Sequence, residues 1–148
     1  MDFIIEAALE DLDQLAALFD EYRIFYGRQS DVQSGRNFIE DRIRKCDSKI
    51  FIAISADSIA GFVQLYPLYS STQMKRLWLL NDLYIAAQYR GRGIGKNLIN
   101  RCKEFCEITD ACGLLLETDK TNIVGNKLYP LTGFKLDEQH NYYSWDNA

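Results

Sequence analysis

Three of the nine glycines in this 148-residue chain fall within five positions, at Gly91, Gly93 and Gly95. An apolar run ending at Ile85 precedes them, and a run with helical spacing begins at Ile94. A glycine loop between a strand and a helix N-terminus directs several backbone N–H groups, and the positive end of the helix dipole, at one point. Such a loop is suited to binding a phosphate, because glycine lets the phosphate approach the backbone closely.

Two common phosphate-binding patterns do not fit this loop. A dinucleotide fingerprint reads G-x-G-x-x-G, but counting from Gly91 the sixth position is Lys96. A Walker A loop reads G-x-x-x-x-G-K-[ST], and here Arg90 takes the first glycine position while Asn97 follows Gly95 and Lys96. A plain glycine turn that only packs a helix near a strand is the structural alternative, although such a turn does not need three alternating glycines together with Arg90 and Arg92.

Length and composition predict one soluble α/β domain over residues 1–148. A chain of this size can bury a core without disulfides or metals, and 47% hydrophobic with 26% charged residues is ordinary for a globular protein. The net charge of −4 argues against nucleic acid as a partner, since binding there depends on Lys and Arg. We read no signal peptide and no run near the ~20 apolar residues of a membrane span, and therefore expect a cytoplasmic protein without a membrane partner.

The four cysteines predict free thiols and no metal site. Cys46, Cys102, Cys106 and Cys112 form no C-x-x-C pair, and the single His140 is distant in sequence. Cys102 and Cys106 are four residues apart on an apolar helix face, which is typical of core packing.

Apolar periodicity predicts a mixed, mostly antiparallel sheet flanked by helices, in the order β-α-α-β-β-β-α-β-α-β-β. The strand before the glycine loop is apolar on both faces at residues 77–80, which indicates a central strand covered on two sides. The expected helices span 10–26, 32–46, 94–110 and 122–131, and the expected strands span 2–6, 49–55, 59–69, 76–86, 113–118, 134–136 and 142–145.

Two motifs carry a resemblance to a known family. Residues 88–93, QYRGRG, fit Q/R-x-x-G-x-G/A and resemble motif A of the acyl-CoA-dependent GNAT superfamily of N-acetyltransferases. Residues 122–134, NIVGNKLYPLTGF, resemble its motif B, with Gly125 where the family usually has alanine. The order of the elements is similar too, so the resemblance covers nearly the whole chain. It implies a GNAT-like fold with strands four and five splayed around the coenzyme.

The resemblance also implies how acetyl-CoA is held. The pantetheine arm would pair with the main chain of Leu83 and Ile85, like an added strand, and a strand-four N–H would polarise the thioester carbonyl. Asn122 matches the residue that hydrogen-bonds the coenzyme arm, although asparagine also suits a helix N-cap. The pyrophosphate would lie on the backbone of Arg90, Gly91, Arg92, Gly93, Ile94, Gly95 and Lys96, with the side chains of Arg92 and Lys96 either adding charge or remaining solvated.

Tyr129 matches the general acid of the family, which protonates the departing thiolate. A phenol with a pKa near ~10 can donate a proton to a coenzyme thiolate as it leaves. The alternative role is a core tyrosine on an amphipathic helix. Pro130 departs from the family pattern, and because proline disfavours helical backbone at the preceding residue, the orientation of Tyr129 could differ from that in relatives.

The acceptor side is predicted from strand four. Polyamine acetyltransferases, which this strand resembles, carry Glu-Asp where this chain has Asn81-Asp82, and an amide cannot act as a base. Asp82 is therefore our candidate for ammonium binding and proton transfer, with a surface or bulge aspartate as the alternative. Glu117 is a second candidate base through water. Aromatic residues of the N-terminal helices and nearby loops could line the acceptor site or lie in the core: Tyr22, Phe25, Tyr26 and Tyr69, of which Tyr26 is our candidate for substrate binding.

These residues predict an acetyl-CoA-dependent N-acetyltransferase that acetylates a primary amine of a small molecule by direct attack in a ternary complex. The alternatives are a protein lysine or N-terminal acetyltransferase and a non-catalytic acyl-CoA-binding regulator. A nucleotide-binding module and a tRNA-modifying enzyme are further rivals. The aromatic run 142–145 could form a homodimer contact, as C-terminal strands do in many family members, and it equally suits a core.

Overall fold

The computed structural model describes residues 2–147. The chain divides into two compact units, one up to Glu117 and one from Thr118 onward. The expectation of a single domain over residues 1–148 stays a prediction.

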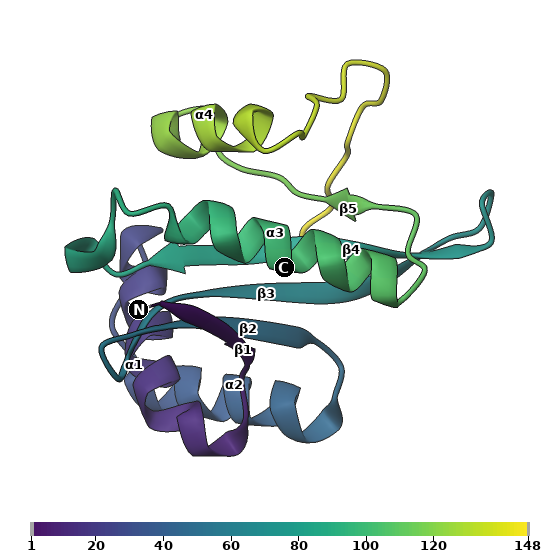
Figure 1. Ribbon diagram of the computed structural model, residues 1–148. Helices are drawn as coiled ribbons and strands as arrows, with labels where there is room; N and C mark the ends of the chain where they lie inside the picture. Colours follow the sequence, from purple (N-terminus) through teal and green to yellow (C-terminus); the bar gives the residue numbers. More distant parts are fainter. Residues whose placement is uncertain (1, 148) are drawn as a thin grey trace. The chain divides into compact units, whose positions relative to one another are not determined.

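The first unit is built on a five-stranded sheet with the order β1-β2-β3-β4-β5 (Figure 1). Neighbouring strands are antiparallel, except that β4 and β5 pair in parallel. The expected α/β class with a mostly antiparallel sheet is therefore confirmed. The strands are β1 (Phe3–Glu6), β2 (Lys49–Ser55), β3 (Ser58–Ser70), β4 (Lys75–Ile85) and β5 (Leu114–Leu115).

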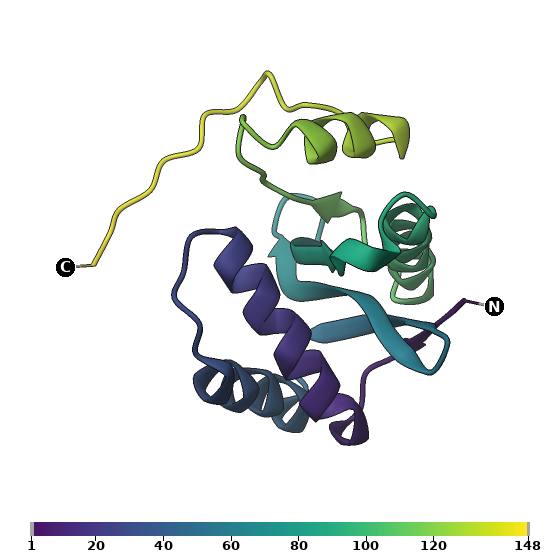
Figure 2. The same ribbon diagram turned by 90° about the vertical axis from the view of Figure 1, so that its left-hand side faces the viewer.

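Helices cover both faces of this sheet, with α1 (Leu12–Phe25) and α2 (Val32–Lys45) on one face and α3 (Ile94–Ile108) on the other (Figures 1 and 2). Alternation along the strands supplies the two apolar layers. Phe62 packs against Phe19 of α1, with ring centroids 6.1 Å apart, whereas Phe51 packs against Phe105 of α3 at 5.5 Å. The sheet is thus buried on both sides, which explains the continuous apolar runs in its central strands.

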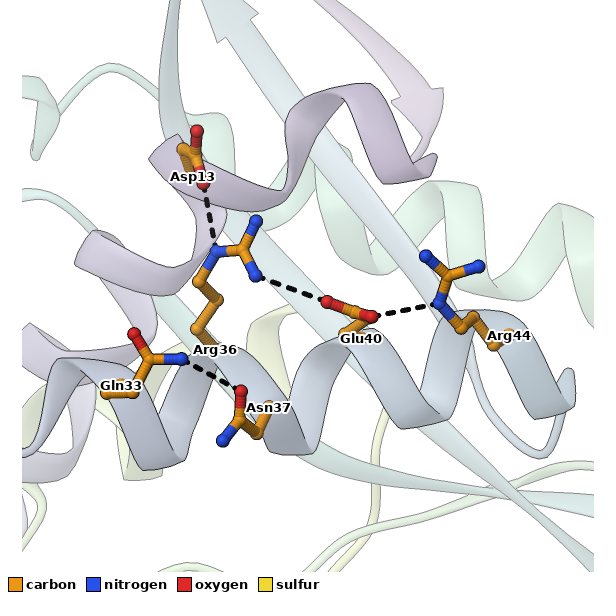
Figure 3. A network of polar contacts seen from close by, with 6 residues as sticks. All are labelled: Asp13, Gln33, Arg36, Asn37, Glu40 and Arg44. Carbon is orange, nitrogen blue, oxygen red and sulfur yellow. Dashed lines mark hydrogen bonds and ion pairs between the residues drawn. The ribbon is translucent and has the colours of Figure 1, made fainter.

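Apolar and polar contacts join α1 to α2. The rings of Phe19 and Phe38 stack with centroids 6.0 Å apart, and Gly35 makes room for them, since a Cβ there would lie 3.1 Å from Phe19 Cδ2. Arg36 bonds Asp13 of α1 at 3.0 Å and belongs to a polar network on the surface of α2 (Figure 3). Exposed ion pairs of this kind contribute little to stability, so the apolar contact dominates.

The second unit contains one helix, α4 (Ile123–Leu131), which continues through Pro130. The expected strands at 134–136 and 142–145 are wrong: the described residues there form neither helix nor strand. A strand requires a hydrogen-bonded neighbour, and the described part of this unit contains no other strand. The aromatic pattern that suggested these strands lies on the surface, with Trp145 82% exposed.

Candidate active site

The glycine loop follows a short 3₁₀ turn, η2 (Ala87–Tyr89), and leads directly into α3. Gly91 and Gly93 have φ of 77° and 79°, a region that other residues rarely adopt. A Cβ at either position would meet nothing within 4 Å. Backbone conformation, and not packing, therefore explains these two glycines, and the space beside them is open.

The N-terminus of α3 is left with unused donors. The first intrahelical bond runs from Asn97 N to Gly93 O (3.0 Å), so the N–H groups of Ile94, Gly95 and Lys96 have no helical acceptor. No side chain among the described residues caps this end. The predicted phosphate-binding segment thus presents backbone donors, as an anion site requires.

The two arginines of the loop fold back onto their own surroundings. Arg90 Nε donates to Ile85 O at 3.0 Å, and its guanidinium lies 5.2 Å from the ring centre of Tyr84. Arg92 donates to Gln88 O at 3.4 Å and lies over the ring of Tyr89. Neither arginine forms an ion pair with a carboxylate among the described residues, and both side chains lie on the surface beside the loop.

The edge of β4 nearest the glycine loop is open. Pairing with β5 ends at Leu79 and Leu115, so residues 80–85 have no β5 partner (Figure 1). Ala86 N bonds Ala60 O at 2.8 Å, and bonded and non-bonded pairs alternate along an antiparallel ladder. The main-chain groups of Leu83 and Ile85 therefore point away from β3, toward the open edge. Strands four and five separate as predicted, and the residues predicted to pair with pantetheine face the gap.

A β-bulge interrupts β4 just before this edge. Leu80 pairs with Leu65 and Asp82 pairs with Gln64, which leaves Asn81 as an extra residue. One added residue moves the following side chains to the other face of the sheet. Trp78 packs on α3, with its Nε1 3.0 Å from Thr109 Oγ1, whereas Asp82 reaches α1. The sequence gives no local signal for this bulge beyond a polar pair within an apolar run.

Asp82 is buried and fully engaged. Its side chain accepts hydrogen bonds from Tyr22 Oη at 2.7 Å, Gln64 Nε2 at 2.7 Å and Asn81 Nδ2 at 3.0 Å. The residue is only 5% exposed. Burial raises the pKa of Asp82 above its usual range, and the bonds from Gln64, Tyr22 and Asn81 oppose this shift in part. The alternative of a surface aspartate is excluded by this burial, and Asp82 pairs with Gln64 directly after the bulge.

Gln64 and Ser48 extend this network and were not singled out from the sequence. Gln64 is completely buried, and its Oε1 accepts a hydrogen bond from Ser48 Oγ at 2.8 Å. A buried amide is costly unless its donors and acceptors are paired. Gln64 therefore anchors Asp82 from within the core. A lone glutamine inside the apolar run 59–68 was the signal that could have identified it.

Tyr22 links the two predicted acceptor residues. It bonds Asp82 and also packs against Tyr26, with ring centroids 5.1 Å apart. Tyr26 is 44% exposed and contacts Phe25, whose ring faces Arg90 of the glycine loop. The C-terminal end of α1 thus lies at the same end of the sheet as the loop, next to Asp82.

Two other candidates lie elsewhere in the first unit. Tyr69 is near the opposite end of β3, where it pairs with Arg76. Glu117 is exposed and follows the end of β5. The structure does not bring Tyr69 to the Asp82 network.

In the second unit, Asn122 caps α4. Its Oδ1 accepts from Gly125 N at 3.1 Å and its Nδ2 donates to Thr118 Oγ1 at 2.8 Å, so the cap alternative is realised. A Cβ at Gly125 would lie 2.5 Å from Asn122 Nδ2 and 3.2 Å from Tyr129 Cε2. This crowding explains why glycine replaces the alanine usual in motif B.

Tyr129 is half-buried on the same helix. Its ring meets Phe134 edge-on at 5.8 Å, and its carbonyl accepts from Phe134 N at 3.0 Å. Pro130 is accommodated inside α4, whose last turn ends at Leu131. Pro130 therefore does not end the helix at Tyr129.

The cysteines are free thiols, two of them deep in the core. Burial raises the pKa of Cys102 to about 12 and that of Cys106 to about 11, so neither is a ready nucleophile. Residues 2–147 contain no group of three or more His, Cys, Asp or Glu side chains placed to hold a metal ion. Within the same range, every helix is too short or too polar to span a bilayer.

A comparison with known protein families identifies the family that has this loop and open strand edge. Residues 13–134 match the Acetyltransferase (GNAT) family. The chain belongs to the GNAT family. Members of this family use acetyl-CoA as a co-substrate, and the predicted family, fold and enzyme class are confirmed.

Individual GNAT relatives cover nearly the whole chain. An uncharacterized N-acetyltransferase, YhfO of Bacillus subtilis, is 35% identical over 140 residues, which are 95% of this chain and 94% of YhfO. A protein of Haemophilus influenzae named "Probable acetyltransferase" is 28% identical over 95% of this chain and 94% of its own length. A solved structure of a "probable acetyltransferase" is 38% identical, with a TM-score of 0.94, and covers 99% of this chain and 98% of that one. The protein is therefore a GNAT acetyltransferase over its described length.

Proposed function

We propose that this acetyltransferase moves the acetyl group of acetyl-CoA to a primary amine of a small molecule. One observation carries the proposal: an unpaired edge of β4 runs from the uncapped N-terminus of α3 to the bulge at Asn81. Main-chain donors for a phosphate and for an extended arm therefore end beside a buried carboxylate.

The donor half of the proposal uses backbone groups. The loop from Arg90 to Lys96 binds the pyrophosphate, and the main chain of Leu83 and Ile85 pairs with the pantetheine arm. Asn122 keeps its role as the cap of α4, and we assign it a contact with the coenzyme arm in addition. Arg90 covers Ile85 O in the structure, so its side chain must move for the arm to use that carbonyl.

The acceptor half uses side chains. Asp82 supplies negative charge that favours an amine over a neutral acceptor, and Tyr26 provides an exposed aromatic wall close to it. An alkylamine with a pKa of ~10.4 is almost wholly protonated at neutral pH, so it must lose one proton before it can attack. We assign that proton to water, because three donors already surround the Asp82 carboxylate.

The transfer itself is a direct displacement. The amine nitrogen forms a bond to the thioester carbon, the carbon–sulfur bond breaks, and the nitrogen gives up its remaining extra proton to water. The departing thiolate takes a proton from Tyr129, which we assign as general acid and which is restored from solvent. The products are an N-acetyl amide and coenzyme A.

The test is thiol release from acetyl-CoA with a panel of primary amines: 1,4-diaminobutane, glycinamide, and a peptide with one lysine. We expect release with at least one small amine and an acetylated product of the expected mass. Tyr129→Phe should lower kcat about 100-fold or more with little change in the KM for acetyl-CoA. Coenzyme binding without turnover on any amine would instead indicate an acyl-CoA-binding regulator, and turnover on the peptide alone would indicate a protein acetyltransferase.

A further inference from the structure

Asn81 is the extra residue of the β4 bulge, and its side chain is exposed while the neighbouring Asp82 is buried. Its Nδ2 donates to Asp82 Oδ1 at 3.0 Å. An ionised carboxylate only accepts hydrogen bonds, so it selects the orientation in which the amide nitrogen of Asn81 faces inward.

The amide oxygen of Asn81 has no partner in this arrangement. Because the amide is planar, this oxygen points away from Asp82 when the nitrogen points toward it, and within residues 2–147 it accepts no hydrogen bond. Asp82 cannot easily turn, because Tyr22 and Gln64 hold it from α1 and from the core. The core thus fixes an exposed acceptor atom in one orientation.

This atom lies where the open edge of β4 ends. Leu83 faces away from β3 by the alternation counted from Ala86. On the other side of the bulge, Trp78 N bonds Gly113 O at 3.1 Å, so the main-chain groups of Trp78, and by alternation those of Leu80, also face away from β3. A strand rises about 3.3 Å per residue, so Asn81 is about 13 Å along β4 from Ile85. An extended arm that starts at the glycine loop and follows this edge leads to the bulge.

Resting on the transferase function proposed above, we propose that Asn81 binds the acceptor: its amide oxygen accepts a hydrogen bond from the amine N–H, and Asp82 is a positioning residue that acts through Asn81. The ligand class is a primary or secondary alkylamine, which offers at least one N–H.

An amide oxygen suits this task better than a carboxylate in direct contact. A neighbouring negative charge favours the protonated form of an amine, which cannot attack a thioester. The oxygen of Asn81 can accept a hydrogen bond from an ammonium or from a neutral amine, and because it carries no net charge it does not hold the amine in the protonated form. Asp82, one residue deeper, attracts the cation without forming a tight pair, since its oxygens are shared among three donors.

The experiment compares Asn81→Ala with Asn37→Ala, a matched exposed asparagine on α2 whose side chain accepts from Gln33. Steady-state kinetics with 1,4-diaminobutane or another amine of the panel give KM and kcat, and calorimetry on the coenzyme A complex gives amine affinity without turnover. We expect Asn81→Ala to raise the KM and the dissociation constant for the amine about tenfold, as for one hydrogen bond to a charged group. The KM for acetyl-CoA and the melting temperature should stay near those of Asn37→Ala. Asn81→Leu repeats the comparison if alanine disturbs the bulge.

The positioning role of Asp82 is tested by a double-mutant cycle. Asp82→Asn should also raise the amine KM, because the amide of Asn81 loses its fixed partner. The double variant Asn81→Ala/Asp82→Asn should be no worse than the poorer single variant, since both changes remove one contact. Effects that multiply would overturn the positioning role.

The two proposals fail in different ways. If the wild type turns over an amine and Asn81→Ala binds that amine equally well, the role of Asn81 is refuted while the transferase function stands. If the wild type neither binds nor acetylates any amine, both proposals are wrong.

Discussion

The edge proposed to bind acetyl-CoA, called the donor edge, and the network proposed to bind the amine, called the acceptor network, are built from different groups. The donor edge, residues 83–96, presents backbone groups: the main chain of β4 and the first N–H groups of α3. The acceptor network, defined as Ser48, Gln64, Asp82 and Tyr22 with the exposed Asn81, consists of side chains joined by hydrogen bonds of 2.7–3.0 Å.

The donor edge and the acceptor network should therefore tolerate substitutions differently. A backbone site depends on conformation and is insensitive to most side chains, whereas a buried polar network depends on every partner being present. The donor edge should therefore fail only where the backbone is altered, and the acceptor network should fail with any single buried substitution.

The largest effect should come from Gly93→Val. A β-branched residue at φ of 79° is strained, and relief of that strain moves the first N–H groups of α3. We expect the KM for acetyl-CoA to rise at least tenfold in the thiol-release assay.

Gly27→Val is the matched control for this variant. Gly27 has φ of 82° and equally open surroundings but ends α1. The Gly27→Val variant should lose about as much stability as Gly93→Val but keep the wild-type KM for acetyl-CoA. Equal effects of the two variants on that KM would show that strain alone, and not the loop, explains the loss.

Gln64→Leu should give the next largest effect. It removes the donor to Asp82 and the acceptor for Ser48 inside the core, and an unsatisfied buried group costs about 1–3 kcal/mol of folding free energy. Urea unfolding measures this loss. The amine KM should rise while the KM for acetyl-CoA is kept. Gln33→Leu, which removes an exposed bond to Asn37, is the control and should change stability little. Similar losses in both variants would contradict the special role of the buried network.

The sequence predicted the donor edge better than the acceptor network, because the first is made of backbone groups and the second of side chains. Glycine spacing and strand periodicity report directly on backbone conformation, so the loop and the order of elements up to β5 were predictable, whereas the open edge was expected from the family resemblance. The bulge at Asn81 depends on register against β3, which no local pattern encodes. Gln64 became important only through its distance to Asp82. The failed strands at 134–136 and 142–145 show the reverse error, since alternating aromatics predict a strand only when a neighbour is present to pair with.

Asp82→Asn should reveal how the network responds to pH. Burial raises the folded pKa of Asp82 above its unfolded value near 3.8, so between these two pKa values the folded state binds more protons than the unfolded state. The free energy of unfolding contributed by Asp82 is then greatest below pH 3.8 and is lost as pH rises through the folded pKa. The asparagine variant lacks this titration and adds only a constant offset. Urea unfolding from pH 3.5 to 7 should show the wild type losing stability relative to Asp82→Asn as pH rises. A difference that is constant with pH, or that grows in favour of the wild type, would contradict the raised pKa.

Arg92→Gln should give the smallest effect and defines how far the donor edge depends on side chains. Arg92 is exposed, and its guanidinium lies over Tyr89. A solvated charge near a phosphate contributes about 0.2–1 kcal/mol, which corresponds to at most about a fivefold rise in the KM for acetyl-CoA. Because exposed charges are screened, that rise should shrink when the assay is repeated at high salt. A loss as large as that of Gly93→Val, persisting at high salt, would mean that the pyrophosphate is held by the arginine side chain and not by the backbone of the loop.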